Sequence, residues 1–499
     1  MRLKITTFVC TVTSFIFSQA ISTPLEKSSN TKMTSYEDLT EFVHQLDQSS
    51  DLLNVEILGR TVEGRNLYVM KFSNSEFGKD KSKIRVLIFA QQHGNEQSGK
   101  EGALLLAKEL LKPENKYLFD KIDFALVPQM NPDGSEKNKR RNGNDMDLNR
   151  NHLILTEPET ISLHKLFNEY LFEVTMDVHE YSPYGGDWEK YGYRRNFNET
   201  VGTITNINIS EDLRKFSFEN YLPFIFDFFS EKGFSSFHYL PGGPPELDYI
   251  RYSTYDINDG RQSLGIQNTF SFIQEGLNGE DNFADNIKHR AEGQMTGMFG
   301  LLKFSYNNKE EIKNLVEKER KKLVKGEVSN QVAIQLDHFS DGSKLKLPLL
   351  SYYSNIDTLV TVNDYRPIVK SVYDVTRPKG YLVPKKLTEV VEWADRHSLM
   401  YIDYTKSEDD KIEQYFIGGI DSIDFERDII VNPIVEVKEI SNNLSGDEYI
   451  FIPTKQLRNN MIVIALEPKS ILGIVTYKKF EKLLKENENF PILRVISKN

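Results

Sequence analysis

The sequence predicts an α/β fold, in which a mixed, largely parallel sheet is flanked by helices, followed by a second, strand-rich accessory domain. Three observations predict it. The chain has 499 residues, of which 39% are hydrophobic and 11% aromatic, enough to bury more than one core. From about Thr34, short apolar runs alternate with runs of helical composition. After about Ser329 the pattern changes to short β-like runs separated by polar turns.

The first domain, residues 34–328, is expected to alternate strands and helices. Short apolar runs between polar turns predict strands, and longer runs with spaced apolar residues predict helices. The expected strands are 83–90, 124–128, 172–178 and 269–274, and the expected helices are 98–111, 157–171 and 309–327. A stretch dense in Pro, Gly and Tyr, residues 238–255, predicts a long surface loop.

Residues 329–499 are expected to form the accessory domain, of mixed α/β or β-rich character. The strand-like runs are 332–339, 358–364, 448–453 and 461–466, and one helix is expected at 386–396. This region contains no catalytic constellation. We therefore expect it to pack on the first domain or to narrow access to its cleft.

The first twenty residues have the features of a targeting signal. Arg2 and Lys4 precede a weakly apolar run, residues 5–17, and small residues lead to Ala20. At about 1.5 Å per residue this run is too short for a bilayer core of about 30 Å, so a cleaved signal peptide (1–20) is favoured over a short membrane anchor. The mature protein is then secreted or periplasmic. Residues 21–33 form a polar leader, and no stable membrane insertion is expected after cleavage.

Charge and cysteine content exclude several classes of protein. The chain has 62 Lys and Arg against 73 Asp and Glu, a formal net charge of −11. This balance disfavours binding to nucleic acid, because phosphates attract the opposite charge. The single cysteine, Cys10, excludes an intramolecular disulfide framework and a multi-cysteine metal site.

Polar residues follow three of the expected strands, where ligands bind in open α/β sheets. His93 and Glu96 follow the first strand, His179 follows the third, and Glu275 follows the last. His93, Glu96 and His179 make a His₂Glu set, the ligands of a catalytic zinc with an open position. Glu275 is then a free carboxylate, which is what a general base requires beside a metal-bound water. The alternative is that each is an ordinary hydrogen-bonded or solvated residue.

The segment between these strands is rich in arginine and amides. Arg150 with Asn149 offers a planar fork and an amide suited to gripping a carboxylate. Arg140 offers a fixed positive charge where a carbonyl oxygen becomes negative in a tetrahedral transition state. Taken alone, the segment also fits a turn-rich loop with solvated arginines.

Together these motifs resemble the zinc metallocarboxypeptidase family, the relatives of carboxypeptidase A, over roughly residues 34–305. The ordered set that carries the resemblance is HGNE (93–96), NPDG (131–134), RRNGNDMDLNRN (140–151), DVHEY (177–181) and FSFIQEG (270–276). The surroundings of Glu275 look more like bacterial outgroup members than the digestive enzymes. The resemblance implies the family's α/β fold, one Zn²⁺ per chain, and peptidase activity.

The resemblance also implies residue roles. The metal ligands would be His93, Glu96 and His179, with Asp147 orienting His93. Glu275 would be the general base that later acts as an acid. In addition, the family's R-x-N pattern selects Arg140 over Arg141 as the group that polarises the scissile carbonyl, and Asn149 with Arg150 would hold the substrate's terminal carboxylate.

Some positions stay open. The tyrosine that digestive members carry on a mobile loop has three candidates here, Tyr249, Tyr252 and Tyr255. Arg261 either binds an anionic substrate group or braces its loop. The leading function is a zinc carboxypeptidase. The alternatives are an amidase or deacylase acting on N-acyl amino acids or cell-wall peptides, and a non-catalytic peptide- or glycan-binding relative, which the retained ligand set argues against.

Overall fold

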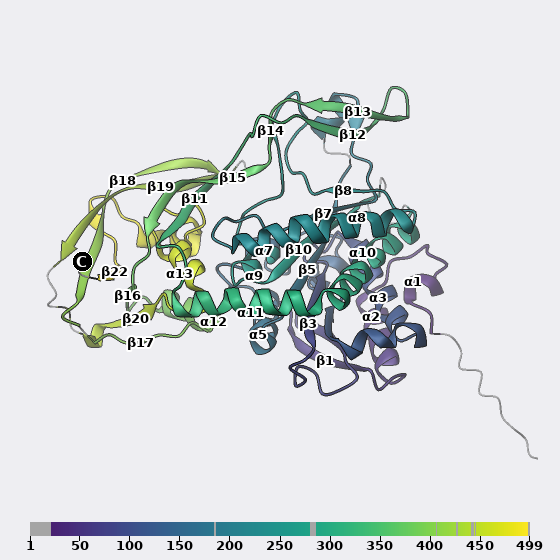
Figure 1. The fold of residues 1–499 in the computed structure, drawn as a ribbon, viewed down its shortest axis with the longest axis horizontal. Helices are drawn as coiled ribbons and strands as arrows, with labels where there is room; N and C mark the ends of the chain where they lie inside the picture. Colours follow the sequence, from purple (N-terminus) through teal and green to yellow (C-terminus); the bar gives the residue numbers. More distant parts are fainter. Residues whose placement is uncertain are drawn as a thin grey trace, which may run out of the picture.

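A computed structural model describes residues 21–183, 186–279, 286–405, 407–425, 428–440, 444 and 446–497 (Figure 1). The predicted signal peptide lies outside these residues. Within them, no helix is both long enough and apolar enough to cross a membrane. The predicted boundary at 328/329 stays a prediction; it lies in the short link between a long helix, α11 (Lys309–Lys325), and strand β11 (Gln331–Phe339).

The centre of the first domain is an eight-stranded mixed sheet, which confirms the predicted fold class. Its four central strands, β4, β3, β5 and β10, run parallel to one another, and the strands on either side of them, β2 and β7, pair with them antiparallel. In spatial order the strands are β1 (Leu53–Arg60), β2 (Asn66–Phe72), β4 (Ile122–Val127), β3 (Ile84–Ala90), β5 (Val174–Tyr181), β10 (Phe270–Leu277), β7 (Glu199–Gly202) and β8 (Ser236–His238).

Helices cover both faces of this sheet, so its central strands are buried on both sides. Along β3, Val86 and Ile88 belong to one core cluster, whereas Leu87 and Phe89 belong to another. This two-sided burial explains why the run at 83–90 is continuously apolar rather than alternating. One face packs against α2 (Tyr36–Asp47), α3 (Gln97–Leu110), α8 (Leu222–Glu231) and α10 (Ile287–Asn307), and the other against α5 (Pro158–Tyr170) and α9 (Gly260–Gly265).

The remaining helices of the first domain are short, and one of them corrects an expectation. Residues 24–27, within the predicted loose leader, form helix α1 (Pro24–Lys27). Thr23 caps it in a reciprocal capping box with Glu26, and Leu25 is buried against α10. Leu25 therefore anchors this segment to the first domain, although most of its residues are polar. The others are α4 (Pro132–Glu136), α6 (Gly186–Lys190) and α7 (Glu211–Phe216).

The region after residue 329 is rich in strands, as predicted. Most of them form a seven-stranded sheet: β16 (Gly380–Pro384), β17 (Ile402–Asp403), β18 (Asp410–Phe425), β19 (Asp428–Ile440), β20 (Tyr449–Pro453), β21 (Glu488–Asn489) and β22 (Leu493–Ser497). The expected helix is present as α12 (Thr388–Arg396). The strand expected at 461–466 is wrong: these residues lie in helix α13 (Asn459–Leu466), whose eight residues are all buried. A short apolar run cannot distinguish a buried strand from a fully buried helix.

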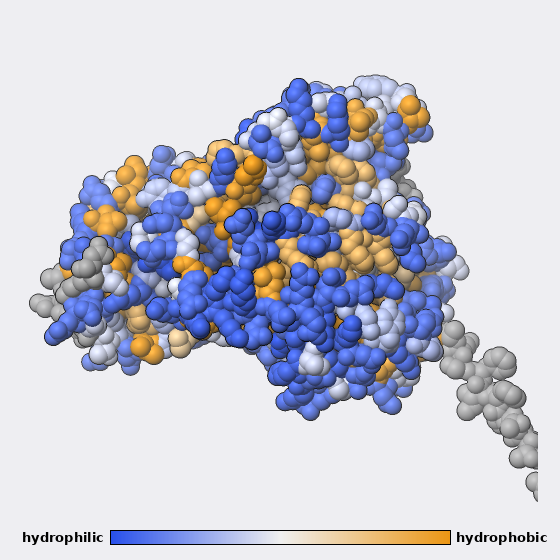
Figure 2. All heavy atoms as spheres, in the orientation of Figure 1, coloured by the Kyte–Doolittle hydropathy of each residue, from blue (hydrophilic) through white to orange (hydrophobic). Residues whose placement is uncertain are grey.

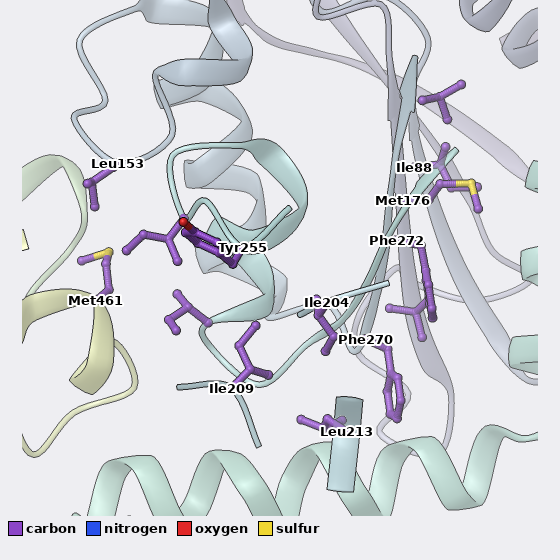
Figure 3. Close-up of a cluster of buried hydrophobic side chains, with 14 of the residues drawn as sticks. Ile88, Leu153, Met176, Ile204, Ile209, Leu213, Tyr255, Phe270, Phe272 and Met461 are labelled. Atoms are coloured by element: carbon purple, nitrogen blue, oxygen red, sulfur yellow. The ribbon is translucent and has the colours of Figure 1, made fainter. Parts of the chain in front are cut away.

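Strands of the second region also pair with the first domain. Strand β12 (Leu345–Ser351) lies between β13 (Asp357–Val362) and β6 (Tyr193–Arg194). Strand β14 (Tyr365–Arg366) pairs with β9 (Ile250–Arg251), and β15 (Ile368–Thr376) pairs with β11. One hydrophobic cluster runs through both regions (Figure 3), joining Met176 and Phe272 of the central sheet to Met461 of α13. On the surface, apolar side chains gather over α8, whereas α11 is largely hydrophilic (Figure 2).

Candidate metal centre and active site

The central sheet brings the predicted ligands together at the carboxyl ends of its strands. His93 lies three residues beyond the end of β3, and Glu96 is the residue that precedes α3. His179 lies near the end of β5. On the neighbouring strand β10, Glu275 is its direct pairing partner. Parallel strands end at one edge of a sheet, which is why segments distant in sequence converge here.

His93, Glu96 and His179 form a compact buried cluster. The Nδ1 atom of His93 lies 2.7 Å from Oε1 of Glu96, and the Nδ1 atom of His179 lies 2.9 Å from Oε2 of the same carboxylate. The two Nδ1 atoms are 3.1 Å apart. One candidate ligand atom from each residue lies within 4.8 Å of the others. This donor set of two imidazoles and one carboxylate fits zinc.

A second carboxylate faces the outer nitrogen of each histidine. Oδ1 of Asp147 lies 3.1 Å from Nε2 of His93, and Oδ1 of Asp177 lies 2.9 Å from Nε2 of His179. Carboxylates in these positions hold a proton on Nε2, so Nδ1 is the nitrogen left to bind a metal. The structure thus places Asp147 where the resemblance implied.

Charge within the cluster shifts several pKa values. Burial alone would disfavour the charge of His179, but Asp177 and Glu96 outweigh it and raise its pKa well above the usual value. Burial likewise opposes ionisation of Glu96, but the two histidines prevail and lower its pKa far below that of a free glutamate. The pKa of Asp147 is also lowered, because His93, Arg140 and Arg150 outweigh its burial. The carboxylates are therefore ionised and ready to take a cation.

Glu275 remains outside this network. Among the described residues, its side chain makes no hydrogen bond or ion pair. Burial raises its pKa; nearby His179 and Arg195 lower it, and Glu96 raises it. A half-buried, uncommitted carboxylate beside a metal ligand has the placement expected of a general base.

The arginine-rich segment reaches the same edge of the sheet. Arg140 donates from Nε to Asp147 Oδ2 at 3.0 Å, and its guanidinium lies 3.5 Å from Glu96. Arg141 instead donates to the backbone oxygen of Asp145. The buried Asn149 has its Nδ2 atom 3.2 Å from Nε2 of His179, and the exposed Arg150 donates to the backbone oxygen of Asn149.

Two of the open positions receive an answer. Arg261 is fully buried and donates to Ser253, Thr254 and Asp259, so it braces its loop and has no exposed surface for a substrate. Among the candidate tyrosines, Tyr252 and Tyr255 are buried, with hydroxyls bonded to Thr203 and to the backbone oxygen of Leu336.

Tyr249, the third candidate, is half-buried. The guanidinium of Arg366, from the second region, lies 3.9 Å from the centre of its ring. Tyr255 also meets the second region, where its ring stacks on His338 with 5.1 Å between ring centres, but of the three candidates Tyr249 is the one that is not fully buried.

Sequence reasoning gave no role to three residues at the site. Asp177 lies two positions before His179 on β5, and the two-residue period of a strand could have placed both on one face. Gln92 donates to Asp177 Oδ2 at 2.8 Å, a contact that no sequence pattern signals. Arg195 stacks on Tyr181 and Trp188, with 5.1 and 5.7 Å between guanidinium and ring centres.

The fold and the site define a class of protein: a metal-dependent hydrolase, built on an α/β sheet with a His₂Glu centre at its carboxyl edge. Residues 39–209 match the family model for zinc carboxypeptidases. The matched segment is thus a zinc carboxypeptidase domain, which makes the protein a metallocarboxypeptidase with zinc as its cofactor.

Three proteins similar to this chain are carboxypeptidases by name. Carboxypeptidase 2 of Trichophyton tonsurans is 22% identical over 489 residues, covering 93% of this chain and 86% of that protein. Human carboxypeptidase D is 34% identical over 143 residues, which are 24% of this chain and 10% of that protein. A metallo-carboxypeptidase from Burkholderia cenocepacia superposes with a TM-score of 0.44 at 20% identity, covering 56% of this chain and 71% of that one.

Proposed function

We propose that this protein is an exported zinc carboxypeptidase that removes C-terminal residues from peptides. One zinc ion per chain would be held by His93, Glu96 and His179. The proposal is carried by the two Nδ1 atoms, from His93 and His179, that converge on the carboxylate of Glu96. Glu275 lies beside His179 in the register of the neighbouring strand. Export rests on residues 1–20, which have the composition of a signal peptide.

Glu275 acts as the general base. A zinc ion held by His93, Glu96 and His179 would supply a Lewis acid for the scissile carbonyl and would make water more acidic. Glu275 accepts a proton from the attacking water and later returns it to the leaving amine. Its raised pKa suits this shuttle, because a carboxyl that titrates closer to neutrality both accepts and returns a proton readily.

The cationic and amide groups orient the substrate. Arg140 lies beside Glu96, where its charge stabilises the oxygen that becomes negative in the transition state. Asn149 and Arg150 bind the terminal carboxylate of the peptide, through an amide and a planar fork of donors. A free C-terminus is therefore the feature that the enzyme recognises.

Glu275→Gln is the sharpest test of the base. The variant keeps all three ligands, so we expect zinc to stay bound at wild-type stoichiometry while kcat falls by about 10²–10⁴-fold. Glu246→Gln, an exposed glutamate, serves as the matched control and retains activity. A Glu275→Gln enzyme with wild-type kcat would refute the proposal.

Chelation and end-blocking test the remaining parts. Dialysis against a zinc chelator should abolish hydrolysis, and added zinc should restore it. Peptides with an amidated C-terminus should be cleaved much more slowly than their free-acid forms. Equal rates on both would rule out the exopeptidase, and faster turnover of N-acyl amino acids than of peptides would favour the amidase.

A further inference from the structure

A buried chain of hydrogen bonds leads away from the metal centre through His152. Nε2 of His152 lies 2.7 Å from Oε1 of Gln92, and its Nδ1 lies 3.0 Å from Nε2 of His164. Gln92 in turn donates from Nε2 to Asp177 at 2.8 Å and to Asn149 Oδ1 at 3.2 Å. All five residues are buried, so water does not compete for these groups.

The direction of every bond in this chain follows from the carboxylate at its end. The carboxylate of Asp177 accepts from the NH₂ group of Gln92, so Oε1 of Gln92 is the atom that faces His152. Nε2 of His152 then carries the proton, and its bare Nδ1 accepts from Nε2 of His164. Burial lowers the pKa of His152 to about 4, which keeps the ring neutral.

Through Gln92, His152 acts on two parts of the site. The first is Asp177, whose other oxygen lies 2.9 Å from Nε2 of His179. The second is Asn149, whose Oδ1 accepts from Gln92 and from the backbone N–H of Gly260 at 2.8 Å. With its oxygen occupied, the amide of Asn149 turns its NH₂ group toward the site, where Nδ2 lies 3.2 Å from Nε2 of His179.

The backbone around His152 is held on two sides. Its own N–H donates to the backbone oxygen of Asn258 at 3.2 Å. The next carbonyl, that of Leu153, accepts from Trp393 Nε1 at 2.8 Å and from His397 Nε2 at 2.7 Å. Trp393 belongs to α12, and His397 is the residue that directly follows this helix. The second region therefore holds the backbone next to His152 in place.

We propose that His152 is a positioning residue, which orients both the zinc ligand His179 and the substrate-binding amide of Asn149 through Gln92. The inference rests on the proposed function, since it assumes that His179 binds zinc and Asn149 binds substrate. Partners of metal ligands commonly change metal affinity or activity by about 10–100-fold when they are removed.

The test compares two replacements of His152. His152→Phe fills the space but removes the donor to Gln92, whereas His152→Gln keeps an N–H at a similar reach. We expect His152→Phe to raise the Kd for zinc by about 10–100-fold in a competition titration against a chromophoric chelator, and to raise KM for free-acid peptides. His152→Gln keeps the donor, so it should bind zinc much more tightly than His152→Phe does, close to wild type.

Further variants separate positioning from general stability. His338→Phe, a buried histidine that bonds the backbone oxygen of Tyr252, should lower Tm without changing zinc affinity. Gln92→Met breaks the same chain of hydrogen bonds at its next link and should also weaken zinc binding. It therefore tests the inference independently, should His152→Phe fail to fold. Wild-type zinc affinity in either folded variant, or equal losses in His152→Phe and His152→Gln, would overturn the inference.

The two proposals fail differently. A wild-type protein that binds no zinc, or full activity in Glu275→Gln, refutes the proposed function. Tight zinc binding by the wild type together with unchanged binding in Gln92→Met refutes only the role of His152.

Discussion

At the residue scale, each ring nitrogen of the two proposed histidine ligands lies close to a carboxylate oxygen. His93 lies between Glu96 and Asp147, and His179 between Glu96 and Asp177. This pairing decides which nitrogen can bind zinc, and it keeps both rings fixed before the metal arrives. Because zinc must displace a proton from His179, whose pKa is raised, zinc binding should weaken as the pH falls.

Arg195 should lower the pKa of Glu275, the proposed general base. Burial raises the pKa of Glu275 above that of a free glutamate, and Arg195 is one of the groups that oppose this rise. The base works only when ionised, so kcat/KM is full above its pKa and is lost as the pH falls through it. Removing the cation raises that pKa further, so Arg195→Met should move the acid limb of the pH profile to higher pH.

Arg195→Lys is the control, because it keeps the charge and should leave the limb near its wild-type position. The measurement is kcat/KM across the pH range at saturating zinc. An acid limb in Arg195→Met that coincides with wild type, or that moves to lower pH, would contradict this account.

At the element scale, the loop before α9 is braced from within. Arg261 donates to Ser253, Thr254 and Asp259 while being fully buried, and Gly260 of the same helix holds Asn149. The brace therefore supports the loop that also positions Asn149, whose amide we propose binds the substrate. Burial raises the pKa of Asp259, and Arg261 counteracts this rise.

Arg261→Met should destabilise the protein rather than change its selectivity. The variant leaves Asp259 buried without its cation, and breaking a buried pair in this way costs about 3–5 kcal/mol. Denaturant unfolding measures the loss, and Arg261→Lys should lose less. Unchanged unfolding free energy with a raised KM for acidic substrates would instead show that Arg261 binds substrate.

At the scale of the whole molecule, the two regions share one hydrophobic cluster, and strands of one region pair with strands of the other. Strand β12 pairs with β6, β14 pairs with β9, and α12 bonds Leu153 close to the site. Elements that share a core and a set of backbone hydrogen bonds tend to unfold together. The second region is thus part of the scaffold that holds the site.

Both regions should unfold in one transition. The sequence has two tryptophans, Trp188 in the first region and Trp393 in the second, and both are buried. In Trp188→Phe only Trp393 reports, and in Trp393→Phe only Trp188 reports. Within each variant, the fluorescence midpoint in denaturant should coincide with the midpoint from far-UV circular dichroism. Separate midpoints would show that the regions unfold independently.

The alternating α/β order, the strand-rich second region and a candidate ligand set could be predicted from the sequence, because apolar runs and the polar residues that follow them are local patterns. Local patterns also misled: 461–466 is a buried helix rather than a strand, and residues 24–27 are anchored by Leu25. The R-x-N pattern had already selected Arg140 over Arg141, whereas only the tertiary structure joined His152 to Gln92 and Leu153 to α12. Such contacts depend on strand order, register and packing between residues far apart in the chain, which local composition does not encode.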